Sequence, residues 1–492
     1  MNTLRDIIDS IPDTDDPALI TPGKEVLSYK NLGRRIEYLS NELLRLGLSE
    51  NDRVGIYIPD KANTVIAIGA CIKAGLVFVP LDMGNSQVRN NEICINCRLR
   101  ALILSPECHF PFENKSEILN KHALDGFTCI LISQSGAMHS PQIPPDLAFI
   151  LNTSGSTGIP KAVMITQQNV CSFIVWVIDQ YDFYSTDRFA SIAPFHFDLS
   201  VFDLYISLYF KATLVLFEPE VIRNPTLLAS FIAEYHISII YATPTLYTSL
   251  VDYGKMTRNR YDAVRYIFFA GEPFRVAKLK ALYQIIPHAK YSNWYGPTET
   301  NVVTYFDLPQ NILDIEDTLP IGRPCRQLHA MIEYGTDNSN IGILYISGPN
   351  VSPGYFNQPL STKEVFQLKN QVIWYCTGDL VSINPSGDYT FHGRRDRMVK
   401  RRGYRIELDE IQQILSTLNC FEDVAIVYDR QKEIPVIYCV YTSLLPIDRL
   451  SIAHVVQSKL PKYMIPDHFI RIEALPLTST GKIDYQAILS LI

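Results

Sequence analysis

The chain has 492 residues, 47% of them hydrophobic, and a formal net charge of −7; this is enough apolar sequence for several packed domains and offers no basic surface for nucleic acid. Only Cys94 and Cys97 of the ten cysteines form a C-x-x-C pair, with no second pair or nearby histidine, so a zinc site is disfavoured and a reduced cytoplasmic protein is expected. The first 16 residues lack a hydrophobic signal core, and the longest apolar stretch, 65–81, contains Lys73 and Gly75. We therefore expect no targeting segment and no contact with a membrane.

Strand-like and helix-like patterns alternate along most of the chain. Residues 53–58 and 77–81 are apolar runs typical of strands, and residues 62–75 between them have a helical pattern that ends at Gly75. Three more strand-like runs end in small or polar residues, at 237–242, 266–272 and 290–296. This alternation predicts an α/β fold with largely parallel sheets, in which ligands bind beyond the carboxyl ends of the strands.

A stretch rich in small hydroxyl residues follows the apolar run at 145–151. Its glycines allow the backbone to approach a ligand closely, and its hydroxyls, backbone N–H groups and lysine are the groups that bind phosphate. The spacing differs from G-x-x-x-x-G-K-[ST], which disfavours a Walker-type loop. The residues concerned are Thr153, Ser154, Gly155, Ser156, Thr157, Gly158 and Lys161. A flexible surface loop remains the alternative from composition alone.

The composition changes near residue 394. The segment 393–407, "GRRDRMVKRRGYRIE", is strongly charged, and about 95 residues of mixed helix and strand pattern follow it. We therefore predict an N-terminal domain of residues 1–395 and a small α+β C-terminal domain of residues 396–492.

Ten short motifs in order resemble the adenylate-forming superfamily, and most closely the free-standing amino-acid adenylation domains of nonribosomal peptide synthesis. The resemblance covers nearly the whole chain, and ten ordered matches are far more specific than any single motif. The matching segments are 27–32, 72–82, 153–162, 197–203, 293–300, 342–357, 376–380, 393–408, 460–469 and 479–485.

The resemblance implies a fold and a reaction. It implies a large N-terminal domain with mostly parallel sheets and a small β-structured subdomain, and a small mobile C-terminal domain. The family reaction joins a carboxylate to the α-phosphate of ATP with Mg²⁺ present, and then passes the acyl group to a phosphopantetheine thiol. We expect that thiol to belong to a separate peptidyl or acyl carrier protein, or to coenzyme A.

The resemblance also assigns roles around ATP. The stretch 153–161 is expected to hold the β- and γ-phosphates, Thr298 to meet the α-phosphate, and Glu299 to bind Mg²⁺. Lys482 is expected to bridge the substrate carboxylate and the α-phosphate as the catalytic lysine. The adenine and ribose are assigned to Ala270, Gly271, Glu272, Tyr295, Asp379 and Arg394.

Two further residues match positions connected with the second half-reaction. Asp396 matches the hinge about which the C-terminal domain turns, and Gly403 matches a position beside the path of the thiol. His196 either helps to position ATP or is a buried structural histidine.

Asp198 matches the aspartate that binds the substrate ammonium in amino-acid ligases, and most fatty-acid and aryl-acid relatives lack it. The remaining pocket residues are neutral, which disfavours a charged substrate side chain, and four of them are aromatic, which favours a compact substrate. They are Leu199, Phe202, Tyr241, Phe268, Ala270, Trp294, Val302 and Val303. The pattern resembles free-standing L-proline ligases, and a small aliphatic amino acid such as alanine is the second candidate.

Two other functions stay open at this point. An acyl-CoA or aryl-acid ligase would share the reaction, although Asp198 argues against it. A catalytically inactive nucleotide-binding homologue would share the fold, although Lys161, Glu299, Asp379 and Lys482 are all intact.

Overall fold

The computed structural model describes residues 3–108, 110, 118–133, 143–155, 160–257, 260–315, 319–335, 340–401, 403–418, 420–430, 432, 435–443, 456, 460–477 and 483–492. The described chain divides into two compact units. The first comprises residues 1–81, 97–151 and 162–395, and the second comprises 82–96, 152–161 and 396–492. The sequence predicted a boundary at 395/396 between an N-terminal domain and a mobile C-terminal domain. That boundary stays a prediction.

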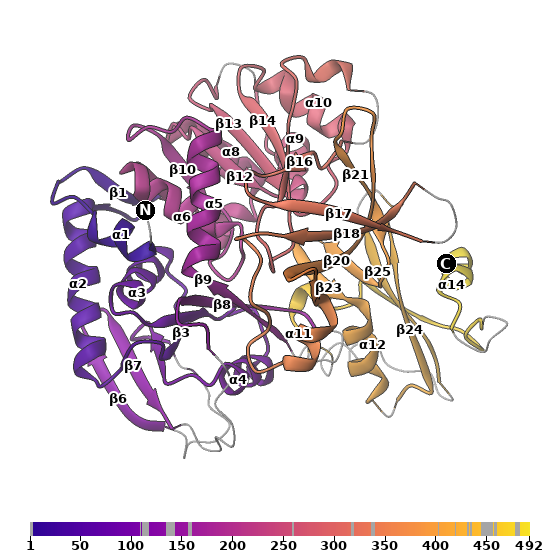
Figure 1. The fold of residues 1–492 in the computed structure, drawn as a ribbon, viewed down its shortest axis with the longest axis horizontal. Coiled ribbons are helices and arrows are strands. Elements are labelled where there is room, and N and C mark those ends of the chain that lie inside the picture. The colour runs from indigo at the N-terminus through magenta and orange to yellow at the C-terminus, as the bar shows by residue number, and fades with distance from the viewer. Residues whose placement is uncertain are drawn as a thin grey trace. The chain divides into compact units, whose positions relative to one another are not determined.

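The first unit contains a nine-stranded sheet whose central strands are parallel (Figure 1). Only the pairs β1–β2, β14–β15 and β15–β16 are antiparallel. In spatial order the strands are β16 (Arg323–Pro324), β15 (Thr304–Asp307), β14 (Lys290–Tyr295), β13 (Tyr266–Ala270), β12 (Ile239–Ala242), β10 (Arg188–Ser191), β11 (Thr213–Leu216), β1 (Pro17–Thr21) and β2 (Glu25–Ser28).

A seven-stranded sheet in the same unit has a parallel centre and an antiparallel hairpin at one edge. Its spatial order is β6 (Ile118–Leu124), β7 (Phe127–Ile132), β5 (Ala101–Leu104), β3 (Arg53–Tyr57), β4 (Val77–Pro80), β8 (Leu147–Thr153) and β9 (Lys161–Thr166). The strand–helix–strand pattern predicted for 53–81 is present as β3, α3 and β4.

A third sheet of five antiparallel strands forms the small β-structured part of this unit. It consists of β17 (His329–Tyr334), β18 (Gly342–Ser347), β20 (Val372–Ile383), β19 (Phe366–Lys369) and β21 (Tyr389–Arg394). The α/β fold class predicted from the sequence is therefore confirmed.

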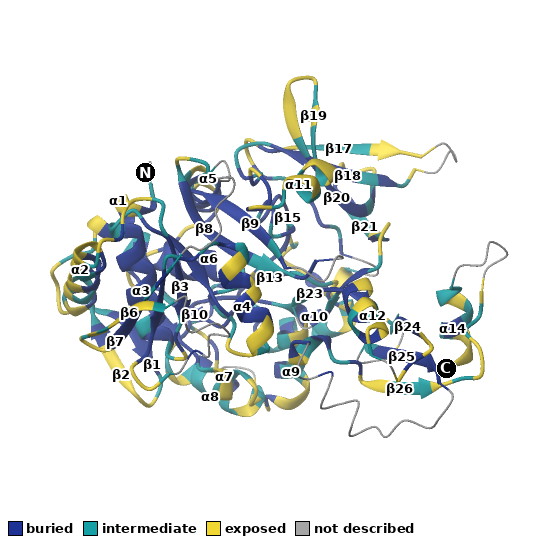
Figure 2. Ribbon diagram, turned by 90° about the horizontal axis from the view of Figure 1, so that it is seen from below, coloured by how far each residue is buried: buried dark blue, intermediate teal, exposed yellow. Residues whose placement is uncertain are grey.

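The helices of the first unit vary in how deeply they are buried. Helix α3 is apolar on all sides and almost wholly buried, whereas α2 buries only one face, as the yellow outer surface of α2 shows in Figure 2. The two pack closely at Gly69, where an added Cβ would lie 2.6 Å from the Ile36 side chain. The helices are α1 (Leu4–Asp9), α2 (Tyr29–Arg45), α3 (Lys61–Lys73), α5 (Gln167–Gln180), α6 (Ser200–Phe210), α7 (Pro219–Ile222), α8 (Pro225–Glu234), α9 (Pro244–Tyr253), α10 (Val276–Ile285), the short 3₁₀ helix η2 (Ile312–Asp314) and α11 (Pro359–Val365).

The second unit is a small α+β assembly with its own apolar core. Strand β25 pairs antiparallel with β24 and parallel with β26, and β22 pairs with β23 as a hairpin. Its elements are α4 (Gln87–Asn96), β22 (Met398–Arg401), β23 (Tyr404–Glu407), α12 (Leu408–Ser416), β24 (Asp423–Asp429), β25 (Val436–Thr442), η3 (Lys462–Met464), β26 (His468–Arg471) and α14 (Tyr485–Leu491).

Candidate active site

The predicted phosphate-binding stretch is bounded by two strands of the seven-stranded sheet. Strand β8 runs two residues beyond its apolar segment and ends at Thr153, and β9 begins at Lys161. Thr153 and Lys161 are therefore strand ends and not loop residues. Ser156, Thr157 and Gly158 lie outside the described residues.

The described donors of this stretch contact oxygen atoms within the second unit. The Gly155 backbone N–H donates to the Glu410 carboxylate at 3.0 Å, and the Lys161 ammonium lies 3.6 Å from the Glu407 carboxylate. The Ser154 hydroxyl donates to the Arg405 carbonyl at 2.8 Å. The Gly155 N–H and the Lys161 ammonium thus both face carboxylate oxygens. Donors that bind the anionic oxygens of a carboxylate can also bind those of a phosphate.

Three residues assigned to the nucleotide form one buried cluster in the first unit. Asp379 on β20 is paired across the sheet with Arg394 on β21, and the Arg394 guanidinium donates to its carboxylate at 2.5 Å. The Tyr295 hydroxyl, at the end of β14, donates to the same carboxylate. Burial, and then the charge of Asp379, keep the pKa of Tyr295 well above its usual value, so the phenol stays neutral. The cluster fixes the Asp379 carboxylate between two donors.

The other adenine-side residues follow β13. Ala270 ends that strand, and Gly271 has a φ of +93°, in the region that favours glycine. The Glu272 carboxylate accepts a hydrogen bond from the Thr245 hydroxyl. These three residues lie at the carboxyl end of a parallel strand, where this fold places ligands.

Glu299 is the residue assigned to magnesium. Its side chain is fully buried, and one carboxylate oxygen accepts a 2.6 Å hydrogen bond from the Tyr355 hydroxyl. Mg²⁺ is commonly held by one or two protein carboxylates, with phosphate and water oxygens completing its shell. A single buried carboxylate held in place by a tyrosine fits that requirement.

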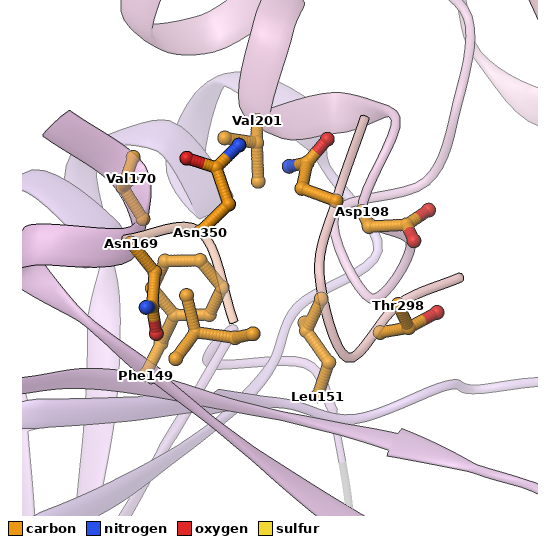
Figure 3. Close-up of a pocket in the computed structure, with 10 residues that line it drawn as sticks. Phe149, Leu151, Asn169, Val170, Asp198, Val201, Thr298 and Asn350 are labelled. Carbon is orange, nitrogen blue, oxygen red and sulfur yellow. The ribbon is translucent and has the colours of Figure 1, made fainter. Parts of the chain in front are cut away.

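Asp198 lines a small cavity within the first unit (Figure 3). It shares one side of the cavity with Thr298, while Asn169 and Val170 lie on the opposite side, and Phe149 contributes an apolar wall. The cavity of about 10 Å³ has room for roughly one water molecule.

The aromatic residues predicted for the substrate pocket pack directly against one another. The Phe268 and Trp294 rings stack at 4.3 Å between centroids, and Phe202 and Tyr241 lie 5.2 and 4.9 Å from the Trp294 ring. All four are buried. Burial, and then the charges of Asp198 and Asp203, raise the pKa of Tyr241 well above its usual value, so the cluster is neutral.

The other pocket residues surround this cluster. Val302 and Val303 are buried, and Leu199 is half-buried directly before α6. The structure thus brings the predicted pocket residues together at the ends of β12, β13 and β14 and at the start of α6.

Lys61 supports the segment that leads to Asp198, and no motif in the sequence indicates this role. Its side chain is buried at the start of α3, and its ammonium donates to the carbonyl oxygens of Ser191, Ile192 and Ala193 at 2.7, 3.2 and 3.4 Å. The Ser191 carbonyl ends strand β10, and the other two follow it, shortly before His196 and Asp198. The buried Lys61 ammonium therefore fixes the backbone of residues 191–193, which leads into the segment that contains Asp198.

The charge on Lys61 predicts an alkaline dependence of stability. Burial lowers the pKa of Lys61 from 10.5 to about 8, against the opposing effect of Asp203 and Glu218. Between pH 8 and 10.5 the folded state loses this proton and the unfolded state keeps it, so the free energy of unfolding should rise by up to ~1.4 kcal/mol per pH unit from this group. Urea unfolding at pH 7.5, 8.5 and 9.5 should show this rise in the wild type but not in Lys61→Met.

Lys61→Arg is the matched control for that measurement, because it keeps a positive charge that does not titrate in this range. It should lack the rise as Lys61→Met does. Equal pH dependence in all three proteins would contradict the assignment of the titration to Lys61.

The residues assigned to the second half-reaction lie in the second unit. Asp396 is exposed, and its carboxylate accepts a hydrogen bond from the Met398 backbone N–H at 3.3 Å. Gly403 has a φ of +82°, so its own backbone conformation favours glycine. Lys482 lies outside the described residues, and Leu477 and Ile483 on either side of it form a β-bridge.

Three contacts of the site were not anticipated. Tyr355 and Asn350 lie inside a matched motif but had no assigned role; Tyr355 binds Glu299, and Asn350 lines the cavity beside Asp198. Asn169 crosses to the same motif, donating to the carbonyls of Pro349 and Val351 at 2.8 and 3.0 Å. Their selection requires tertiary contacts, which a single sequence does not reveal.

The two parallel-centred sheets, the β-structured part and the clustered motifs define an α/β enzyme of the adenylate-forming type. Residues 12–356 match the family described as AMP-binding enzyme, and the chain belongs to that family. The resemblance seen in the sequence is thereby confirmed. None of the helices that the structure describes is long and apolar enough to cross a membrane.

Known relatives match over most of their length. An L-proline–[L-prolyl-carrier protein] ligase from Pseudomonas fluorescens is 32% identical, over 94% of this chain and 93% of the relative. A D-alanine–D-alanyl carrier protein ligase from Staphylococcus aureus is 33% identical, over 87% of each. The solved structure of holo-PA1221, a nonribosomal peptide synthetase protein with adenylation and carrier domains, has a TM-score of 0.81 at 21% identity, covering 100% of this chain and 84% of that one.

Proposed function

We propose that this protein uses ATP to activate a small neutral amino acid as its aminoacyl-adenylate and then transfers the acyl group to the phosphopantetheine thiol of a separate carrier protein. L-proline is the first candidate substrate, and a small amino acid such as alanine is the second. The names of both curated relatives support the carrier-protein reaction, and together they support a small substrate.

The observation that carries the proposal is Asp198. It is half-buried at the edge of a small cavity, and its carboxylate points away from the centre of that cavity (Figure 3). In the proposal the substrate ammonium binds at this carboxylate. An ammonium and a carboxylate that leave water together must pair closely. Fatty and aryl acids have no ammonium, so this carboxylate favours an amino acid over them.

The chemistry requires a carboxylate to approach a polyphosphate. Two unit charges at 4 Å repel by ~4 kcal/mol at an effective dielectric of 20. In our proposal the donors of the 153–161 stretch hold the β- and γ-phosphates, Thr298 meets the α-phosphate, and Lys482 neutralises the attacking carboxylate and the α-phosphate together. Magnesium, when bound by Glu299, supplies further positive charge at the phosphates.

The nucleoside is held by the buried cluster of the first unit. In the proposal Asp379 accepts hydrogen bonds from the ribose hydroxyls, since an ionised carboxylate offers several acceptor positions. Tyr295 presents its ring to adenine while its hydroxyl remains bonded to Asp379. Arg394 donates to that carboxylate and holds its orientation.

The test is exchange of labelled pyrophosphate into ATP with proline, alanine, glycine, valine, phenylalanine and benzoate. We expect exchange to depend on a small neutral amino acid, with proline highest. Exchange driven by benzoate would contradict the proposal. Absence of exchange with every acid in the panel would also contradict it. Transfer of the labelled amino acid to a purified holo carrier protein, with the apo form as control, tests the second half-reaction.

A further inference from the structure

We propose that Tyr181 is a specificity-determining residue of this protein: its hydroxyl positions the Trp294 indole, which limits the size of the amino-acid side chain. The inference rests on the proposed function, because it concerns the substrate pocket. Tyr181 lies directly after α5, more than 110 residues from Trp294 in sequence, and matches none of the motifs that carried the resemblance.

The hydrogen bonds at the Tyr181 hydroxyl are determined by its partners. It donates its only proton to the Asp307 carboxylate at 2.8 Å, because an ionised carboxylate can only accept. The Trp294 indole N–H can only donate, and it lies 3.1 Å from the same oxygen. The Tyr181 hydroxyl therefore accepts from Trp294 and from the buried Ser292 hydroxyl, which lies 3.1 Å away, and Asp307 fixes the direction of all three bonds.

Trp294 is the part of the pocket that this hydrogen bond controls. Its side chain is 1% exposed, and its ring stacks on Phe268 and meets Phe202 edge-on. The Phe268 and Phe202 rings restrict the indole but carry no hydrogen-bond acceptor, and its N–H donates to the Tyr181 hydroxyl. With the hydroxyl in place, the observed orientation of the indole satisfies its buried N–H.

The two partners of the Tyr181 hydroxyl, Asp307 and Trp294, differ in exposure to solvent. Asp307 is exposed at the end of β15, whereas Tyr181 and Trp294 are buried. Removing the Tyr181 hydroxyl leaves Asp307 to water and leaves the Ser292 hydroxyl its bond to the Phe306 carbonyl, but it removes the acceptor of the buried Trp294 N–H. The effect of that change is therefore concentrated on the indole, which is the wall of the substrate pocket.

The ring of Tyr181 has a separate packing role that the test must leave intact. It contacts Phe268 at 4.9 Å and Tyr266 at 5.7 Å between centroids. Tyr181→Phe keeps these contacts and deletes one oxygen atom. Tyr184→Phe, at an exposed tyrosine three residues further along the chain, is the matched control.

The experiment measures kcat/KM in pyrophosphate exchange for alanine, proline, valine and phenylalanine. For Tyr181→Phe we expect the ratio of kcat/KM for phenylalanine to that for alanine to rise at least tenfold, with the KM for ATP within twofold of the wild-type value. Tyr184→Phe should leave both unchanged. An unchanged ratio in Tyr181→Phe would overturn the proposal.

A double-mutant cycle with Trp294→Phe separates positioning from general loosening. Trp294→Phe removes the indole N–H from the other side of the contact, so adding Tyr181→Phe should change the ratio by less than twofold. Additive effects of the two changes would overturn the proposal. Failure of the wild type to show any amino-acid-dependent exchange would contradict the proposed function instead.

The positioning role of Tyr181 can also be tested without any enzyme activity, by NMR. In protein with ¹⁵N-labelled tryptophan, the indole N–H resonance missing from Trp294→Phe identifies Trp294. That resonance should move upfield in Tyr181→Phe and stay in place in Tyr184→Phe, since loss of a hydrogen bond increases the shielding of the proton. An unmoved resonance would overturn the positioning role whether or not exchange is detected.

Discussion

Replacing Lys482 with alanine should lower aminoacyl-adenylate formation by about a thousandfold or more, while transfer from supplied aminoacyl-adenylate to the carrier survives. In the proposed reaction Lys482 contacts the carboxylate and the α-phosphate as their charges meet, so its contribution arises mainly in the transition state. Losing charge-assisted contacts worth ~4 kcal/mol corresponds to about three decades in rate. Pyrophosphate exchange measures the first half-reaction, and loading of the carrier from chemically prepared adenylate measures the second.

Lys121→Ala is the control, because Lys121 is exposed on β6 and belongs to no motif of the site. It should leave both half-reactions near the wild-type rates. An equal loss of both half-reactions in Lys482→Ala would show that the lysine does not act in adenylation alone. It would also remove the support for a C-terminal domain that serves the two steps in turn.

Asp198→Ala should raise the KM for the amino acid about a hundredfold and leave the KM for ATP nearly unchanged. Removing one member of a buried ion pair costs ~3–5 kcal/mol. Because Asp198 is half-buried, water screens part of this effect and the lower end of that range is expected. Steady-state exchange at varied amino acid and at varied ATP separates the two constants.

Asp198→Asn keeps the shape of the side chain without its charge, and it should resemble Asp198→Ala. Asp262→Ala, at an exposed position before β13, is the control for loss of a carboxylate. If Asp198→Asn retained the wild-type KM, the ammonium would bind elsewhere. An equal rise in the KM for ATP would place Asp198 at the nucleotide instead.

Local pattern predicted the sheet elements around the site well. The run at 290–296 became β14 and the run at 266–272 became β13, because buried strands in parallel sheets are continuous apolar segments with polar residues at their ends. The end of β8 was misjudged, since the polar residues Asn152 and Thr153 continue the strand. Periodicity records burial, and a strand can continue where its side chains are no longer buried.

The supporting residues could not be predicted in the same way. Most lysines are exposed, so nothing in the sequence around Lys61 indicates that its ammonium binds three interior carbonyls. Tyr181 meets Trp294 across 113 residues. Such contacts depend on how distant strands and helices are brought together, whereas motifs record only what is near in sequence.

The Asp379 cluster has a consequence for the arrival of a nucleotide. A carboxylate offers about four lone-pair positions, and Tyr295 and Arg394 each occupy one. The two lone-pair positions that remain can each accept a hydrogen bond from one of the two vicinal hydroxyls of a ribose. Under the proposed function, the ribose therefore binds a carboxylate that Tyr295 and Arg394 have already oriented in the folded protein. Recognition of the sugar then requires no rotamer change at Asp379.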